Sequence, residues 1–211
     1  MTHVFLTGAS GTIGSALVPR LLADPSQQVT LLLRAGNDGD LAARLYGLRV
    51  HWGLAEGDPR LQRLHAMQGD IAQPHLGLPE GQRAELAQGC THIIHCAASV
   101  KLNMALDEAR ATAVTPTRSI LALARRCAAQ GQLQKVDLVS TVGVWGRTPG
   151  AMPERRLPEV ADFHNTYEAA KAEAERVVWA EGDGLPITVH RHSMVVGDSR
   201  DGRVIHFQVF Y

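Results

Sequence analysis

The turn at residues 8–14 narrows the possible folds more than any other feature, because it contains three glycines at a regular spacing. The apolar run HVFLTG (residues 3–8) predicts a buried strand, and residues 12–24 place apolar side chains on one helical face. Glycines between a strand and a helix permit a sharp turn and a close backbone approach to a phosphate, which the helix N-terminus attracts. Without the neighbouring strand and helix, the three glycines could equally form a purely structural turn between a strand and a helix. In this context we expect a dinucleotide site that includes Gly8, Ser10, Gly11, Thr12, Ile13 and Gly14.

Strand and helix patterns alternate along the rest of the chain. Buried-strand runs occupy residues 28–34, 64–71, 91–98, 134–141 and 186–197, and helical patterns occupy residues 40–48, 105–131 and 165–182. Pro116 should kink the second of these helices or mark its true start, and Asn165 is a candidate N-cap of the third. The alternation predicts one α/β domain over residues 1–211, a Rossmann-type doubly wound parallel sheet with helices on both faces.

Composition and charge exclude several classes of protein. The 21 basic and 21 acidic residues balance, so no overall field attracts nucleic acid or an anionic membrane. The chain lacks a signal-peptide pattern and an apolar run of the roughly 20 residues that span a bilayer. Cys90, Cys96 and Cys127 fit no metal-ligand spacing, so we expect no metal site. We expect a cytoplasmic protein that binds a small-molecule substrate, with no nucleic-acid or membrane partner.

The choice between the two nicotinamide dinucleotides depends on Arg34, at the end of the second predicted strand. NAD-specific folds usually place an acidic residue there to accept a hydrogen bond from the ribose, whereas arginine suits a 2′-phosphate. We therefore expect NADP(H) to be preferred, with NAD(H) possible and Arg44 a second candidate for the same phosphate. Asp70 and Ile71 follow the third strand, where the carboxylate could contact the adenine or simply form a turn.

Several motifs in order resemble the extended short-chain dehydrogenase/reductases. They are TGASGTIG, GDI, HCAA, STVGVWG, YEAAK and VVGDSRDG. The stretches GDIAQPHLGL, IIHCAASVKLNMALDEA and GDSRDG are most similar to the thioester-reductase and fatty-acyl-reductase branch of that superfamily. The resemblance implies an NADPH-dependent oxidoreductase that reduces a carbonyl or an acyl thioester. A nucleotide-sugar epimerase or dehydratase is the alternative enzyme, and a non-catalytic dinucleotide-binding module is the alternative outside catalysis.

The resemblance also assigns roles to particular residues. It implies that the catalytic residues are Thr141, Tyr167 and Lys171, and that Ala97, Ala98 and Val100 line the cofactor. We also expect Met194, after the sixth strand, to contact the cofactor. In the family the lysine binds the nicotinamide ribose, the tyrosine donates a proton to the substrate oxygen, and the Ser/Thr holds that oxygen.

The spacing of Tyr167 and Lys171 supports this assignment, because residues four apart share one face of a helix. A free tyrosine has a pKa near 10, which is too high for easy proton transfer at neutral pH. An adjacent ammonium favours the phenolate, so we expect Lys171 to lower the pKa of Tyr167.

This chain departs from the family at three places. Ala113 stands where the family usually has Asn, and His192 stands where it usually has Pro. The chain also ends soon after the sixth strand, so we expect the C-terminal substrate domain to be absent, in a truncated form, a fragment or a degenerate member. We expect the apolar tail to be an exposed patch suited to association; it comprises Val204, Ile205, Phe207, Val209 and Phe210. Members of the family often dimerise through the helices that contain Tyr167 and follow Met104, so a homodimer is possible.

Overall fold

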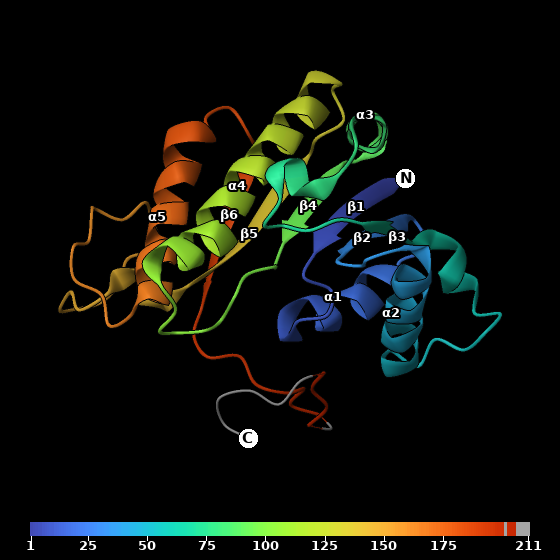
Figure 1. Cartoon of the computed structure of the whole chain (residues 1–211), viewed down its shortest axis with the longest axis horizontal. Coiled ribbons are helices and arrows are strands. Elements are labelled where there is room, and N and C mark those ends of the chain that lie inside the picture. The colour runs from blue at the N-terminus through green and yellow to red at the C-terminus, as the bar shows by residue number, and fades with distance from the viewer. Residues whose placement is uncertain (201, 206–211) are drawn as a thin grey trace.

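Six parallel strands form one sheet in the computed structural model, which describes residues 1–200 and 202–205. The strands lie in the order β3–β2–β1–β4–β5–β6 (Figure 1), and each neighbouring pair is parallel. Their bounds are β1 (Thr2–Thr7), β2 (Gln27–Leu33), β3 (Leu64–Gln68), β4 (His92–His95), β5 (Lys135–Thr141) and β6 (Ile187–His192). The predicted doubly wound parallel sheet is confirmed.

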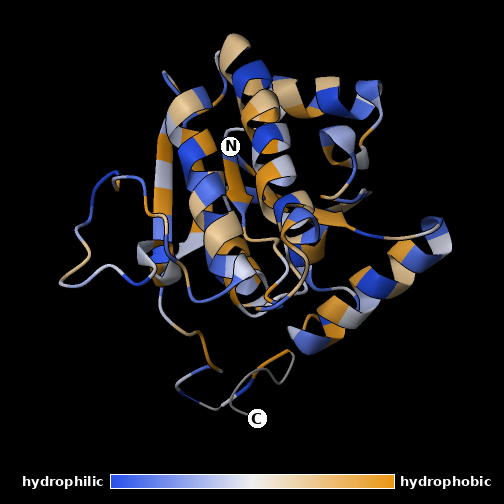
Figure 2. Ribbon diagram, turned by 60° about the vertical axis from the view of Figure 1, so that its left-hand side comes forward, coloured by the Kyte–Doolittle hydropathy of each residue, from blue (hydrophilic) through white to orange (hydrophobic). Residues whose placement is uncertain are grey.

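Helices cover both faces of the sheet. The α-helices are α1 (Thr12–Leu22), α2 (Asp38–His51), α3 (Glu80–Gly89), α4 (Leu106–Ala129) and α5 (Thr166–Glu181). Short 3-10 turns are η1 (Pro59–Arg63), η2 (Pro74–Gly77) and η3 (Val142–Trp145). In Figure 2 the central strands are largely orange, whereas the covering helices carry both colours. This is the distribution expected when strands are buried on both sides and each helix buries one face.

The alternation of side chains along β1 shows how the two layers of core arise. Val4 and Leu6 pack with apolar residues of α1 and α2, such as Val18 and Leu48. Phe5 belongs to the core on the opposite face, which α3, α4 and the end of α5 cover. Successive strand residues point to opposite faces, so one short apolar run supplies both layers.

Helix α4 continues through Pro116, where the sequence predicts either a kink or the start of the helix. It begins at Leu106, ten residues before Pro116, so the expectation that Pro116 marks its start is wrong. An interior proline costs about 3 kcal/mol or more, because it removes a backbone hydrogen bond. The compensation comes from packing, since the buried side of α4 presents Ala113 and Leu121 to Ala170 and Ala174 of α5.

Helix α3 is not predicted by the sequence pattern. This helix contains Gly81 and ends at Gly89, and only Leu86 and Ala87 in it are buried. Two glycines and so narrow an apolar face give little periodic signal. Its position is decided by packing on the sheet and on α4.

The N-terminus of α5 is anchored to the loop that follows β4. Asn165 is the N-cap, as predicted, and its side-chain oxygen accepts a hydrogen bond from the backbone N–H of Glu168 at 2.9 Å. The Thr166 hydroxyl donates to the carbonyl oxygens of Leu102, at 3.1 Å, and Met104, at 2.8 Å. Two segments far apart in the sequence are therefore joined where α5 begins.

The apolar tail is only partly within the described residues. Val204 and Ile205 are half-buried, and Ile205 packs against the core layer beneath α1 and α2, so these two residues do not form the expected exposed patch. Phe207, Val209 and Phe210 lie outside the described residues. Across residues 1–200 and 202–205, no helix has both the length and the apolar character needed to cross a membrane.

Replacing Asn165 with alanine should lower the free energy of unfolding by about 1 kcal/mol, because the first turn of α5 loses its side-chain cap. Urea unfolding followed by circular dichroism measures this change. Asn103→Ala is the matched control, because Asn103 is exposed in the loop before α4 and has no hydrogen bond within the described residues. Equal stability of the two variants would contradict the capping role.

Candidate active site

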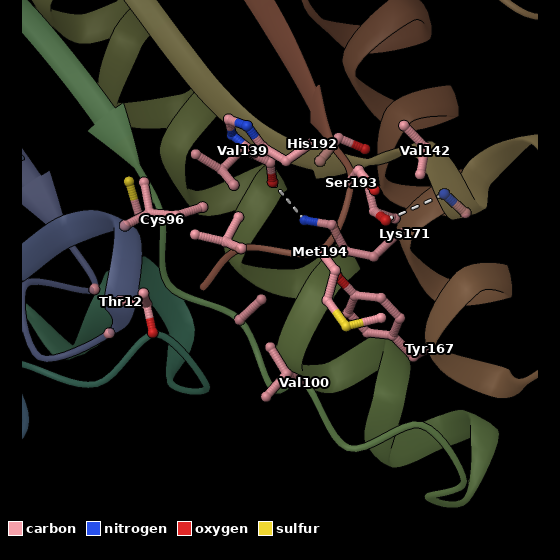
Figure 3. A pocket seen from close by; sticks show the side chains of 18 of the residues that line it. Thr12, Cys96, Val100, Val139, Val142, Tyr167, Lys171, His192, Ser193 and Met194 are labelled. Atoms are coloured by element: carbon pink, nitrogen blue, oxygen red, sulfur yellow. Dashed lines mark hydrogen bonds between the residues drawn. The ribbon is translucent and has the colours of Figure 1, made fainter. Parts of the chain in front are cut away.

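A pocket of about 490 Å³ opens at the carboxyl edge of the sheet. It is lined by residues that follow β1, β4 and β6, by the end of β5, and by the first turns of α5 (Figure 3). The strand order reverses between β1 and β4, and open α/β sheets bind ligands at such a switch point. The predicted site residues that line the pocket are Gly8, Gly11, Thr12, Ile13, Gly14, Ala98, Val100, Thr141, Tyr167, Lys171 and Met194.

The glycine loop leaves no room for a side chain at Gly8 or Gly14. Gly8 has a φ of +83°, and a Cβ added there would lie 2.6 Å from the backbone nitrogen of Ala97. A Cβ on Gly14 would lie 2.2 Å from the carbonyl oxygen of Gly8. Helix α1 starts immediately after Gly11, which provides no side-chain cap, and its first turn contains no acidic residue. The free N–H groups and positive end of α1 therefore suit an anion such as a pyrophosphate.

A buried hydrogen bond joins the two strand ends beside this loop. The Thr7 hydroxyl and Nδ1 of His95 are 2.7 Å apart, and both residues are buried. Burial, with a smaller contribution from the Lys171 ammonium, lowers the pKa of His95 to about 3. His95 is therefore neutral at physiological pH and acts as a packed hydrogen-bonding residue.

The three predicted catalytic side chains meet in the same pocket. Tyr167 and Lys171 extend from α5 (Figure 3), and Thr141 is the last residue of β5. The Thr141 hydroxyl oxygen accepts a hydrogen bond from the backbone N–H of Gly143 at 3.1 Å. That bond fixes its oxygen at the base of η3, beside Tyr167.

Lys171 is buried and points to the sheet. Its Nζ donates a hydrogen bond to the carbonyl oxygen of Val139 at 2.6 Å, drawn as a dashed line in Figure 3. Burial lowers the pKa of Lys171 to about 8, an effect opposed by the Glu175 carboxylate. The amine thus remains mostly protonated at neutral pH.

The pKa of Tyr167 differs from the expectation. Burial raises the pKa of its phenol, the Thr141 side chain acts in the opposite direction, and the Glu168 carboxylate raises it further. The expected lowering is wrong, because burial outweighs the influences that lower the pKa of Tyr167. Tyr167 therefore keeps its proton at neutral pH.

The two substituted positions have different surroundings. Ala113 is buried between α4 and α5, and its carbonyl oxygen accepts a hydrogen bond from the Thr117 hydroxyl at 2.7 Å. His192 lines the pocket, its Nε2 is buried without a hydrogen-bond partner in the described chain, and its ring stacks on His190. Burial lowers the pKa of His192, with smaller contributions from His190 and Lys171.

The remaining predicted residues do not line the pocket. Arg34 and Arg44 are exposed, with no ion pair or hydrogen bond within the described residues. The Asp70 carboxylate accepts a hydrogen bond from the backbone N–H of Ala72 at 2.9 Å. This bond forms a local turn, which is one of the two alternatives that the sequence allows for Asp70. Ile71 packs at the edge of the core. Ser10 is exposed in the glycine loop, and Ala97 supports the pocket through its contact with Gly8.

Several pocket residues were not predicted to be site residues, although most of them lie within the quoted motifs. They are mostly apolar and come from the loop after β4, from η3 and from the segment after β6: Leu102, Val142, Val195, Val196 and Val204. Cys96, Val139 and Glu168 also line the pocket. Such residues can be found only once the strand ends have been brought together.

Comparison with known proteins places the chain in a family. Residues 6–211 match the male sterility protein family of NAD-binding domains. The chain belongs to this family. It is thus a member of the thioester-reductase and fatty-acyl-reductase branch of the extended short-chain dehydrogenase/reductases, as predicted.

Two curated relatives illustrate the branch. The chain is 33% identical to the isonitrile lipopeptide synthase of Streptomyces coeruleorubidus, an alignment that covers 96% of this chain and 14% of the synthase. It is 26% identical to the fatty acyl-CoA reductase wat of Drosophila melanogaster, covering 94% of this chain and 44% of that enzyme. The chain thus spans less than half of each of these relatives.

Solved structures agree with this placement. The terminal R domain from the myxalamid PKS-NRPS biosynthetic pathway has a TM-score of 0.83 and 29% identity, with 95% of this chain and 51% of that chain covered. A UDP-glucuronic acid 4-epimerase from Bacillus cereus, in complex with NAD, has a TM-score of 0.68 and 22% identity, with 93% and 58% covered. The second likeness concerns the fold alone. The family and the glycine cradle together identify a nicotinamide dinucleotide as the cofactor.

Replacing Gly14 with alanine should weaken dinucleotide binding at least about tenfold, a loss of about 1.4 kcal/mol. The added Cβ would force the Gly8 carbonyl or α1 to move out of the phosphate-binding arrangement. A fluorescence titration with NADPH measures the affinity.

Gly47→Ala is the matched control for this variant. Gly47 lies within α2 with no atom within 4 Å of an added Cβ, so this substitution should leave binding unchanged and stabilise the helix by up to about 1 kcal/mol. Undiminished binding by the Gly14 variant would show that the loop does not hold the phosphates.

Proposed function

We propose that this chain is the cofactor-binding and catalytic part of an NADPH-dependent reductase that acts on an acyl thioester or a related carbonyl compound. The observation that carries the proposal is the meeting of Tyr167, Thr141 and Lys171 in one pocket with the glycine cradle of α1. A phosphate site and a proton donor at opposite walls of one cavity are what hydride transfer to a carbonyl requires.

The residues around the cradle fit a dinucleotide. Gly8 and Gly14 lie against neighbouring backbone with no room for a Cβ, so no side chain at these two positions covers the start of α1. The N-terminus of α1 also has no acidic side chain to repel phosphates. When bound, the reduced nicotinamide supplies the hydride for the reaction. The chain's own contribution is to hold the cofactor, to orient the substrate carbonyl and to supply a proton.

Tyr167 is the proton donor in this proposal. Its raised pKa keeps the phenol protonated at neutral pH, so it can donate to the substrate oxygen as negative charge develops there. The Thr141 hydroxyl, fixed by the N–H of Gly143, would donate a hydrogen bond to the same oxygen. The Lys171 ammonium lines the same pocket, and its role in this proposal is the one that the family resemblance implies, binding of the nicotinamide ribose.

The pocket walls support an apolar substrate group. Six of its lining residues are large, exposed hydrophobic side chains, namely Val100, Leu102, Val142, Met194, Val195 and Val196. Exposed apolar side chains gathered around one opening mark a surface that is covered on binding. An acyl chain meets this requirement, and the relatives described as a lipopeptide synthase and a fatty acyl-CoA reductase support the same substrate class.

The preference for NADPH rests on Arg34. It directly follows β2, its side chain is exposed, and its guanidinium has no carboxylate partner within the described residues. A guanidinium in this state is available to a 2′-phosphate, which it can bind through two hydrogen bonds. Asp40, an acidic residue in the first turn of α2, does not pair with Arg34. Its carboxylate instead accepts hydrogen bonds from Gly36 and Asn37 of the preceding loop.

Tyr167→Phe should reduce NADPH consumption with a long-chain acyl-CoA by at least about a hundredfold, because the general acid is lost. NADPH affinity should remain nearly unchanged, since the aromatic ring is retained. Tyr46→Phe, on the exposed face of α2, is the matched control and should retain full turnover. Unaltered turnover by the Tyr167 variant, or conversion of a nucleotide sugar without net NADPH consumption, would contradict the proposal.

Arg34→Ala should weaken NADPH binding about tenfold, the usual effect of losing a charged hydrogen bond, and leave NADH binding unchanged. Parallel fluorescence titrations with the two cofactors measure the ratio of affinities. Arg118→Ala is the control, because Arg118 lies on α4 and pairs with Glu181. An equal loss for both cofactors would assign Arg34 to a role other than recognition of the 2′-phosphate.

A further inference from the structure

A buried charged cluster lies behind the catalytic wall of the pocket. The Arg191 guanidinium of β6 donates to both carboxylate oxygens of Glu175 on α5, with distances of 2.7 Å, 3.1 Å and 3.2 Å. Only 10% of the Arg191 side chain and 8% of the Glu175 side chain are exposed. The Ser140 hydroxyl of β5 also donates to the Glu175 carboxylate. Ser140 lies in the motif STVGVWG, but none of the three residues was predicted to belong to the site.

Glu175 lies one helical turn beyond Lys171, on the same side of α5. The two side chains attach α5 to adjacent residues of β5, because Lys171 donates to the carbonyl oxygen of Val139 and Ser140 donates to Glu175. The next residue of β5 is Thr141, which lines the pocket. Two bonds in succession therefore fix the position of the catalytic helix along the strand that carries Thr141.

Arg191 extends the cluster to a third segment. Its Nη1 donates to the carbonyl oxygens of Arg155, at 3.0 Å, and Pro153, at 3.4 Å, in the loop between η3 and α5. One guanidinium thus joins the last strand, the catalytic helix and this loop. The bidentate pair also gives the buried Glu175 carboxylate the partner that a buried charge requires.

We propose that Glu175 and Arg191 are positioning residues of the active site: Glu175 supports the positive charge of Lys171 where the amine lies against Val139, and Arg191 fixes the position of Glu175. The inference rests on the proposed function only in assigning Lys171 to the reaction. Its physical content concerns one amine and one carboxylate, so it can be tested without a substrate.

The other titratable side chains around Lys171 are uncharged near pH 8, so the negative charge that supports its ammonium comes from Glu175. Burial lowers the pKa of His95 on β4 to about 3 and also lowers the pKa of His192 on β6. Burial raises the pKa of Cys96, after β4, to about 12 and raises the pKa of Tyr167 on α5. All four groups are therefore neutral near pH 8. Glu175 is the leading influence that raises the pKa of Lys171 against burial.

The chain contains only three lysines, Lys101, Lys135 and Lys171, which makes a direct measurement possible. Protein labelled with 13C at the lysine Cε gives three lysine signals, and Lys101→Arg and Lys135→Arg identify the remaining signal as Lys171. Titration of the wild-type chain should place the Lys171 midpoint near pH 8, the pKa to which burial lowers it.

In Glu175→Gln the Lys171 midpoint should move down by about one pH unit, because the amide keeps the shape and removes the negative charge. In Arg191→Met it should move up, because the guanidinium no longer offsets the negative charge of Glu175. A merely structural role gives a different result. If the substitutions only loosen α5 and admit water, both midpoints rise toward the ordinary lysine value.

Glu173→Gln is the matched control, because Glu173 lies on the same helix but pairs with Arg110 of α4 at 2.8 Å. It should leave the Lys171 midpoint unchanged. In an assay of the proposed reductase activity, the alkaline limit of NADPH consumption should shift with the Lys171 midpoint, to lower pH in Glu175→Gln. An unchanged or raised midpoint in folded Glu175→Gln overturns the proposal. If that variant does not fold, an unchanged or lowered midpoint in Arg191→Met overturns it.

Discussion

The site depends on the close backbone contact where β1 turns into α1. Gly8 lies against the chain that leaves β4, and Gly14 lies against the carbonyl of Gly8, so neither position admits a Cβ. Because no side chain intervenes, α1 begins directly over the strand ends, with its free N–H groups facing the pocket. The buried bond between Thr7 and His95 holds the same two strands together. The rest of the carboxyl edge is arranged around this contact.

The opposite wall is held by charge. Helix α5 is fastened to β5 through Lys171 and Glu175, and Glu175 is in turn fastened to β6 through Arg191. Keeping an ammonium in this position opposes folding, as its pKa shows. The pKa of Lys171 falls from 10.5 to about 8 on burial. Between those two values the unfolded chain binds more protons than the folded chain, so this group makes stability rise with pH across that interval.

The departures from the family can now be placed in the molecule. Ala113 is part of the tightly packed contact between α4 and α5, where small side chains allow the two helices to approach. His192 enters the pocket wall at the end of β6, where it adds a neutral imidazole. The first departure concerns packing beside the catalytic helix, whereas the second changes the polarity of the pocket itself.

The alternation of elements, the glycine loop and the helical pairing of Tyr167 with Lys171 were determined by the sequence itself, because each depends on neighbours within a few residues. Local signals failed where packing outweighs propensity, as in α3 and across Pro116 of α4. Only the tertiary structure decided which way Lys171 points and why the pKa of Tyr167 is raised, since burial depends on the whole fold. It also joined Ser140, Glu175 and Arg191, which come from three elements with no shared motif. Parallel strands bring such residues to one edge of the sheet, and their spacing along the sequence does not predict that they become neighbours.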